Sequence, residues 1–174
     1  GTWVGVNDSG LLAGVANLPV AADGDSRSRG LLCLDVLGCR SVDAARRLVE
    51  REVDRRRYDG FNLVVGGSDG GFVASFDVSG LSVFEVEGAG VVTNSGFDDP
   101  DGKARRVAEA LPDAASADDW LDGVRPLMSD HDLGVCVHGD DRGTTSSTLV
   151  RGGTDPAVWF ASGPPCEADY VSCV

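Results

Sequence analysis

The chain has 174 residues, a length for which one hydrophobic core is the default. Its 28 acidic residues exceed its 15 basic residues, which gives a formal net charge of −13, and no apolar run approaches the ~20 residues of a membrane span. These features predict one cytoplasmic domain over residues 1–174 with no membrane span. They also exclude nucleic acid as an expected partner, because phosphate binding needs a basic stripe.

The acidic residues are unusual in kind as well as in number. Asp accounts for 22 of the 28, and Lys103 is the only lysine. Self-repulsion would destabilise the compact state in dilute salt, but at 1 M salt the Debye length is only ~3 Å and the carboxylates mainly hold hydration water. We therefore expect a surface adapted to high salt. A surface for cationic partners is the alternative, which the scatter of the acidic residues along the chain disfavours.

The five cysteines are odd in number and form no C-x-x-C pair, so neither a disulfide framework nor a zinc knuckle is specified. Cys136 and His138 would share one face of an extended segment, where they could bind a soft metal or a haem iron. No convincing further ligand set accompanies them in the sequence. We expect free thiols in a reducing compartment, no metal site and no cofactor, with haem as the alternative.

Two β-rich runs open the chain, at residues 2–7 and 11–17, and Asp8-Ser9-Gly10 between them is typical of a hairpin turn. Because a strand begins almost at residue 1 with no initiator Met, we expect that Gly1 is not the gene's first codon. Two helices follow. One is predicted over residues 30–37 and ends at Gly38, and the other has Ser41 as its N-cap, with apolar residues at helical spacing from 42 to 53.

The middle of the chain predicts an antiparallel meander, and the second half predicts helices and a closing hairpin. Gly-containing turns separate the strands. Asn94 opens a polar loop that runs through Asp101. Ser116 is the expected N-cap of the second helix in this half, and Pro126 should disturb the last turn of that helix. The expected strands cover residues 61–65, 71–77, 81–87 and 91–94, the helices 103–111 and 116–128, and the final hairpin 145–151 and 157–161. Strands, then helices, then strands indicate an α+β fold with helices covering antiparallel sheet.

Six phrases in this order resemble the NRDE family, also called the transport and Golgi organisation protein 2 family. They are Gly1-Thr2-Trp3-Val4-Gly5-Val6-Asn7, Asn17, Ser28-Arg29-Gly30-Leu31-Leu32, Tyr58-Asp59-Gly60-Phe61-Asn62-Leu63, Thr93-Asn94, and Gly143-Thr144-Thr145-Ser146-Ser147-Thr148. The resemblance spans Gly1 to about Val150. It implies a four-layer α/β/β/α sandwich similar to that of N-terminal-nucleophile hydrolases, and the salt-adapted composition makes the chain similar to a haloarchaeal member.

The chain departs from the family at its N-terminus. Family members begin with a Cys after the initiator Met and continue with Asn-Arg-Asp-Glu, and neither feature occurs in this sequence. In a hydrolase of this type the terminal amine serves as the base for its own side chain, so the nucleophile must be residue 1 of the mature protein. We expect a fragment that lacks an N-terminal segment; loss of the chemistry is the alternative.

The resemblance implies a cysteine-dependent amidohydrolase that acts on non-peptide C–N bonds of a small molecule when full length. The present chain is then expected to be inactive, because Gly1 offers no nucleophile. The alternative is a non-enzymatic carrier of haem or lipid, or a trafficking protein.

Four residues in the family phrases are candidate site residues. Asn94 and Asn17 each follow a β run, where an amide can donate to an oxyanion; a local Asx turn is the alternative. Arg29 lies where a guanidinium could clamp a substrate carboxylate, and a salt bridge to one of the many Asp residues is the alternative. Asn62 is a substrate-binding candidate whose alternative is a structural amide that satisfies neighbouring backbone.

The composition predicts a salt-dependent stability. Lowering the salt concentration from molar to ~0.1 M should lower the free energy of unfolding, because carboxylate repulsion is then less screened. Thermal and urea unfolding across a KCl series at fixed pH measures this. Unchanged midpoints would contradict adaptation to high salt.

Overall fold

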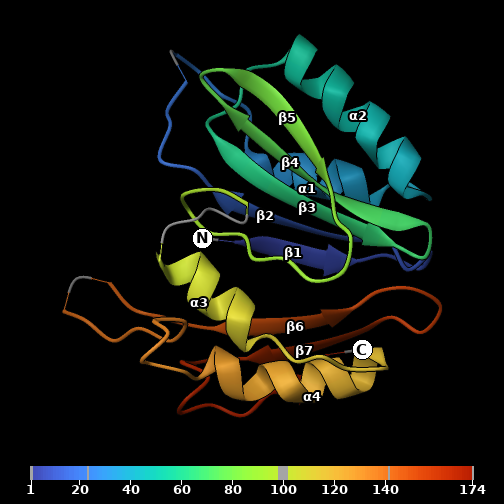
Figure 1. The fold of residues 1–174 in the computed structure, drawn as a ribbon. Helices are drawn as coiled ribbons and strands as arrows, with labels where there is room; N and C mark the ends of the chain where they lie inside the picture. The colour runs from blue at the N-terminus through green and yellow to red at the C-terminus, as the bar shows by residue number, and fades with distance from the viewer. Residues whose placement is uncertain (1, 23, 98–101, 141, 174) are drawn as a thin grey trace.

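The computed structural model describes residues 2–22, 24–97, 102–140 and 142–173. They form two antiparallel sheets and four helices, which confirms the predicted α+β class (Figure 1). The larger sheet has the strand order β1-β2-β3-β4-β5, and the smaller has the order β6-β7-β8. The strands are β1 (Trp3–Val6), β2 (Leu12–Asn17), β3 (Phe61–Gly67), β4 (Gly70–Asp77), β5 (Gly80–Glu85), β6 (Ser147–Arg151), β7 (Ala157–Ala161) and β8 (Val171–Ser172).

The opening hairpin forms as predicted and joins the two sheets. Gly10 has a φ of 75° in its turn, a backbone conformation that favours glycine. The Gly153 N–H donates to the Gly10 carbonyl at 2.9 Å. A Cβ at Gly10 would lie 1.9 Å from the Gly153 carbonyl oxygen, so this close approach of the two turns requires glycine.

Helices α1 (Arg29–Leu37) and α2 (Val42–Arg55) cover one face of the larger sheet (Figure 1). Ser41 caps α2 as predicted, because its Oγ accepts from the Ala44 N–H at 3.2 Å. Apolar residues of both helices pack against β2, β3 and β4 and build the main core. The core cluster contains Leu11, Ala13, Val15, Leu32, Cys33, Val36, Val42, Ala45, Val49, Tyr58, Phe61, Leu63, Val65, Phe72 and Ala74.

Helices α3 (Gly102–Ala110) and α4 (Ala117–Met128) belong to the half of the molecule that contains the smaller sheet (Figure 1). The Ser116 Oγ accepts from the Asp119 N–H at 3.1 Å and so caps α4 as predicted. Pro126 lies inside the last turn of α4, which continues to Met128. The core of this half is small among the described residues, with Leu121, Val124 and Leu149 as its buried members.

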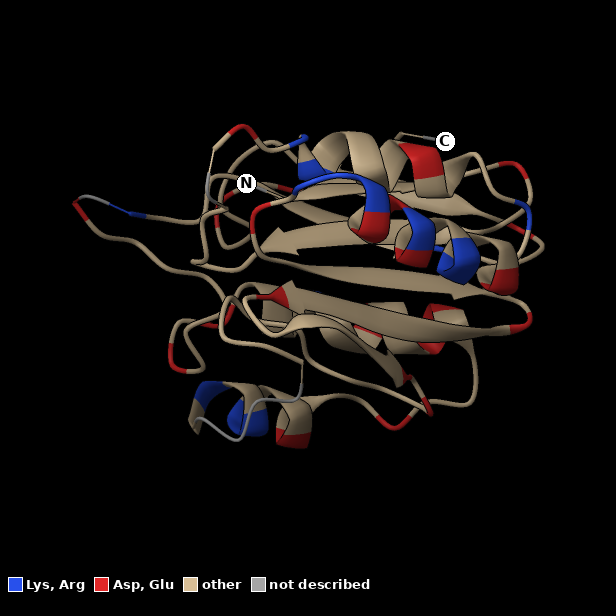
Figure 2. Ribbon diagram, turned by 90° about the horizontal axis from the view of Figure 1, so that it is seen from above, with Lys and Arg blue, Asp and Glu red and all other residues tan. Residues whose placement is uncertain are grey.

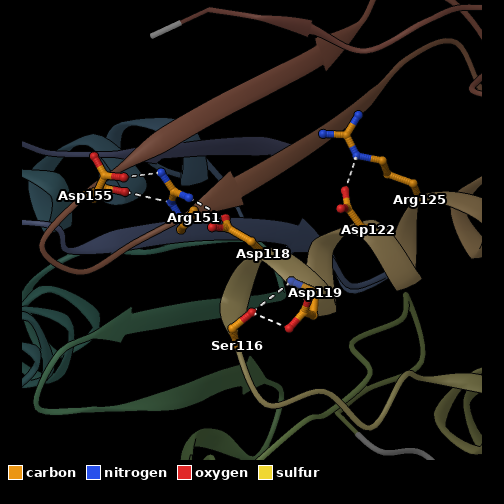
Figure 3. A network of polar contacts seen from close by, with 7 residues as sticks. All are labelled: Ser116, Asp118, Asp119, Asp122, Arg125, Arg151 and Asp155. Carbon is orange, nitrogen blue, oxygen red and sulfur yellow. Dashed lines mark hydrogen bonds and ion pairs between the residues drawn. The ribbon is translucent and has the colours of Figure 1, made fainter.

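Ion pairs fasten α4 to β6. Arg151 on β6 donates to Asp118 at the start of α4 and to Asp155 in the turn that follows β6 (Figure 3).

Figure 2 shows acidic residues on loops around the molecule and interleaved with arginines on the helices. The acidic charge is therefore distributed over many elements and is not concentrated in one run.

One predicted strand does not form, and one observed strand was not predicted. Residues 91–94 do not form a strand, since only an isolated bridge pairs Val92 with Phe97 and a turn intervenes, in which the Thr93 N–H donates to the Gly96 carbonyl at 2.9 Å. Strand β8 was not predicted, because two residues carry too little periodicity. Part of the predicted polar loop, residues 98–101, lies outside the described residues.

No helix in the described part of the chain is long and apolar enough to cross a membrane.

The core assignment makes a matched prediction on α1. Leu32 is fully buried and Leu34 is 63% exposed. The Leu32→Ala variant should lose ~2–5 kcal/mol of unfolding free energy, because it leaves a cavity, whereas Leu34→Ala should change it by less than ~0.5 kcal/mol. Urea unfolding of the two variants measures both values. Equal losses would show that α1 does not pack as described.

Candidate functional site

The four sequence-predicted site residues lie around the first residues of β3. Arg29 at the start of α1 donates from Nη1 to the Gly60 carbonyl at 2.9 Å. Asn17 pairs with Phe61 across the β2–β3 ladder. Asn62 follows on β3 itself and donates from Nδ2 to the Thr93 carbonyl at 3.1 Å, which places Asn94 next to this contact. Residues far apart in the sequence therefore meet at one end of the larger sheet.

Asn62 has the most unusual environment of the four. Its side chain is fully buried, and Oδ1 has no hydrogen-bond partner among the described residues. Exchanging the two amide atoms would set an oxygen against the Thr93 carbonyl, so the orientation with Nδ2 toward Thr93 is fixed. A buried acceptor without a partner costs about 1–3 kcal/mol. Asn62 thus bonds to the backbone through Nδ2, as expected if it is a structural amide. Its Oδ1 remains able to accept a hydrogen bond from a donor.

Asn94 is exposed at the tip of a turn that a neighbour caps. The Thr93 Oγ1 accepts from the Ser95 N–H at 3.1 Å, so the Thr93 hydroxyl closes this turn. The Asn94 side chain makes no hydrogen bond to any described residue, which differs from the Asx turn considered as its alternative. Its amide is available to a ligand.

A recess of about 550 Å³ lies beside Asn94, between the segment that contains this residue and helices α3 and α4. Lys103 supplies the one cationic side chain among the residues that line it. The apolar part of the lining comprises Val91, Val92, Val107, Leu111, Trp120, Val124, Met128 and Val135. A mostly apolar recess with a few polar groups is typical of a small-molecule site.

Asn17 and Asn62 face opposite sides of the larger sheet. Side chains alternate along a strand, so Asn17 shares the side of Ala13 and Val15, which pack in the core with α1. Asn62 is offset by one position in the ladder and points to the other side. The structure therefore brings Asn62 and Asn94 together and leaves Asn17 with Arg29 at the α1 side of the same sheet end.

The start of β3 is held by a tight backbone contact with residues 18–22. Gly60 accepts from the Leu18 N–H at 3.0 Å and donates to the Val20 carbonyl at 2.7 Å. Its missing side chain is needed, because a Cβ would lie 2.8 Å from the Val20 Cβ. The Asp59 Oδ1 accepts a further hydrogen bond from the Ala22 N–H at 3.0 Å. Arg29 makes no salt bridge within 4.0 Å to a described acidic residue, and its Nη1 instead donates to this same Gly60 carbonyl.

No cysteine is among the residues that line the recess beside Asn94. Cys33 is buried on α1, where desolvation raises the pKa of its thiol to about 11, so it is a thiol at neutral pH. Cys136 and Cys166 lie instead in a cluster with His131 and His138, and the four potential ligand atoms are within 4.8 Å of one another. Burial and the neighbouring Cys136 raise the pKa of the Cys166 thiol.

This cluster was missed in the sequence. Cys136 and His138 were noted as a pair, but His131 lies five residues before Cys136 and Cys166 lies beyond β6 and β7. None of these spacings matches a common metal-ligand motif. The only signal in the sequence was the proximity of Cys136 to two histidines.

Comparison with known proteins gives one result for this sequence. Residues 1–133 match the family model described as Transport and Golgi organisation 2. The matched range contains all four candidate site residues and ends before Cys136. No curated protein matches the chain.

The environment of Asp59 predicts that the free energy of unfolding depends on pH. The hydrogen bond from the Ala22 N–H, followed by a bond with Ser26 and the charge of Arg29, lowers the pKa of this carboxyl below its ordinary value of 3.8. The stabilisation is therefore present above pH 3.8 and is lost as the pH falls through the lowered pKa. Asp59→Asn should lose stability near neutral pH and show a shallower decline in acid.

Urea unfolding between neutral and acid pH at fixed salt tests this prediction. Asp69→Asn, in the exposed β3–β4 turn, is the matched control and should keep the wild-type pH slope. Parallel curves for Asp59→Asn and the wild type would contradict the role of the Ala22 contact.

Proposed function

This chain belongs to the transport and Golgi organisation 2 family, and on that premise we propose that it forms the substrate-binding part of a small-molecule amidohydrolase. The reaction class is that implied by the resemblance to N-terminal-nucleophile hydrolases, cleavage of a non-peptide C–N bond. In this proposal the helices α1 and α2, the two sheets and α4 correspond to the four layers of that fold.

The observation that supports the proposal best is the contact between Asn62 and Thr93. It fixes the backbone next to Asn94, whose amide is exposed at the edge of the 550 Å³ recess. An amide N–H held at the place where a carbonyl oxygen becomes negative stabilises the transition state of acyl transfer. Asn94 is thus the proposed oxyanion donor, and Asn62 is a positioning residue that acts through Thr93.

The lining of the recess indicates the substrate class. Its apolar side chains suit an acyl or aromatic body, and Lys103 suits a carboxylate. An N-acylated amino acid combines these groups with an amide bond between them. Arg29, whose Nη1 is bonded to the Gly60 carbonyl, is proposed to support the sheet end and Asn17 to line its other side.

The proposed nucleophile is the N-terminal cysteine of the family, which is none of the five cysteines in this sequence. The raised pKa of Cys33 disfavours it as a substitute, because the thiolate is the reactive form. The gene tests this requirement directly. Codons for Met-Cys followed by Asn-Arg-Asp-Glu upstream of Gly1 support the proposal, and an upstream reading frame without a cysteine at that place would contradict it.

A single substitution tests the role of Asn94. In the full-length gene product, Asn94→Ala should lower kcat for N-acyl amino acids by about 10²–10³-fold, because one oxyanion donor is removed. Ser95→Ala, at the exposed neighbouring position, is the control and should retain the wild-type kcat. The rates come from release of the free amino acid.

Three outcomes would count against this assignment. Equal kcat values for Asn94→Ala and the wild type would remove Asn94 from the reaction. Loss of activity in Ser95→Ala as well would point to disruption of the turn. Saturable binding without turnover by the full-length wild type would favour a carrier.

A further inference from the structure

The four side chains of the Cys–His cluster converge with the spacing of a metal site. The Cys136 and Cys166 sulfur atoms are 3.6 Å apart, and the His138 Nε2 lies 3.7 Å from the first and 3.1 Å from the second. A zinc ion with Zn–S bonds of ~2.3 Å and Zn–N bonds of ~2.0–2.1 Å holds its ligands about 3.3–3.8 Å apart in a regular tetrahedron. These three atoms therefore already lie close to the three corners of such a site.

His131 supplies the fourth position. Its ring lies beside that of His138, with centroids 5.1 Å apart and planes inclined by 30°. The farthest pair of ligand atoms in the cluster is within 4.8 Å, about 1 Å more than in a regular tetrahedron around zinc, and His131 is an exposed side chain. Two thiols and two imidazoles form a Cys₂His₂ set, which is characteristic of closed structural zinc sites.

The backbone around the cluster is fixed by hydrogen bonds independent of any metal. The loop after α4 turns around Asp130, whose carbonyl accepts from the N–H groups of Val135 and Cys136 at 3.1 and 2.9 Å. The Ser129 Oγ donates to the Pro165 carbonyl at 2.9 Å and so joins this loop to the one that carries Cys166. Two segments distant in the sequence are thus held where their side chains can share one ion.

The chemistry of the ligands decides between zinc and other occupants. Cys136 and Cys166 are free thiols in this structure, and two imidazoles at the same point have no role in a disulfide. A haem iron takes at most two axial ligands from the protein, on opposite sides of its plane, whereas these four ligand atoms converge on one point. Calcium and magnesium prefer oxygen ligands.

The location also gives the ion a structural role. The half of the molecule around the smaller sheet buries only three residues in its cluster, against fifteen in the main core of the described chain. Small cores are often supplemented by a metal or a disulfide. Beyond β7, the described residues contact the rest of the chain through a small number of bonds. Among them are the two residue pairs of β8, the bonds of the Pro165 carbonyl to Ser129 and of the Cys173 N–H to the Val158 carbonyl, and the bond from the Tyr170 hydroxyl to Ser147.

We infer that His131, Cys136, His138 and Cys166 bind one structural zinc ion, which fastens the loop after α4 to the loop after β7. None of these four residues is among those that line the recess beside Asn94, although Val135, the neighbour of Cys136, is. The zinc ion stabilises the half of the molecule that supplies α4 to the recess.

Cobalt substitution tests the site on the whole chain. Protein stripped with a chelator should bind one equivalent of Co²⁺ and show the visible bands of four-coordinate cobalt with thiolate-to-metal charge transfer, and Zn²⁺ should displace it. Carboxylates on the acidic surface cannot produce the charge-transfer band, so this signal separates the cluster from surface binding. Zinc should also raise the melting temperature.

Substitution of a ligand tests the site, and substitution of a cysteine outside the cluster is the control. Cys166→Ser should weaken Co²⁺ binding by at least ~100-fold, because loss of even an outer-shell partner costs 10–100-fold. Cys173→Ser removes an exposed cysteine outside the cluster and should bind cobalt as the wild type does. Where Cys166→Ser unfolds, His138→Asn provides the same comparison.

The proposal fails on any of three results. The first is a wild type that gives no charge-transfer band with cobalt. The second is binding of cobalt by Cys166→Ser or His138→Asn with wild-type affinity. The third is a Cys136–Cys166 disulfide that zinc does not prevent, found by peptide mapping of protein purified without reducing agent.

Discussion

The buried amide of Asn62 is the interaction on which the candidate site depends. Its Nδ2 holds the Thr93 carbonyl from within the larger sheet, and the hydroxyl of Thr93 closes the turn that presents Asn94. A polar side chain at this depth is costly unless it is hydrogen-bonded, and here Oδ1 has no partner among the described residues. The remaining oxygen is the kind of unsatisfied group that native proteins retain at sites with a role beyond packing.

The surroundings of Asn62 explain why the sheet end keeps its shape. Gly60 admits the backbone of residues 18–20 at a separation that a side chain would prevent, and Asp59 and Arg29 add polar contacts on either side of it. These contacts join segments that are distant in the sequence, since the Asp59 carboxylate accepts from the Ala22 N–H and the Arg29 guanidinium donates to the Gly60 carbonyl. The composition predicts that the many surface carboxylates serve hydration in high salt, which leaves the neutral amides as candidates for chemistry. In our proposals, the amides recognise a ligand at the sheet end and the Cys–His cluster stabilises the small half.

Sequence patterns were reliable where one local rule determined the outcome. Ser41 and Ser116 were identified as helix caps from residue type and spacing, and Gly10 from the turn that it must make. Residues 91–94 were mistaken for a strand because Val91 and Val92 favour extended structure, whereas the Thr93 hydroxyl and Gly96 close a turn instead. The convergence of His131 and Cys166 depends on the path of β6 and β7 between them, which no local spacing records. The opposite orientation of Asn17 and Asn62 likewise follows from the register of β2 and β3.

In our proposal, Asn62 and Thr93 hold the Asn94 amide where it binds the carbonyl of a small ligand. An NMR titration with N-acetylphenylalanine tests this, since the side-chain amide resonances of each asparagine are observed separately. We expect a saturable shift of the Asn94 NH₂ resonances, with no shift for Asn7, whose amide is already bonded to the carbonyls of Leu37 and Cys39. Saturable binding that shifts other resonances and leaves those of Asn94 unchanged would contradict it.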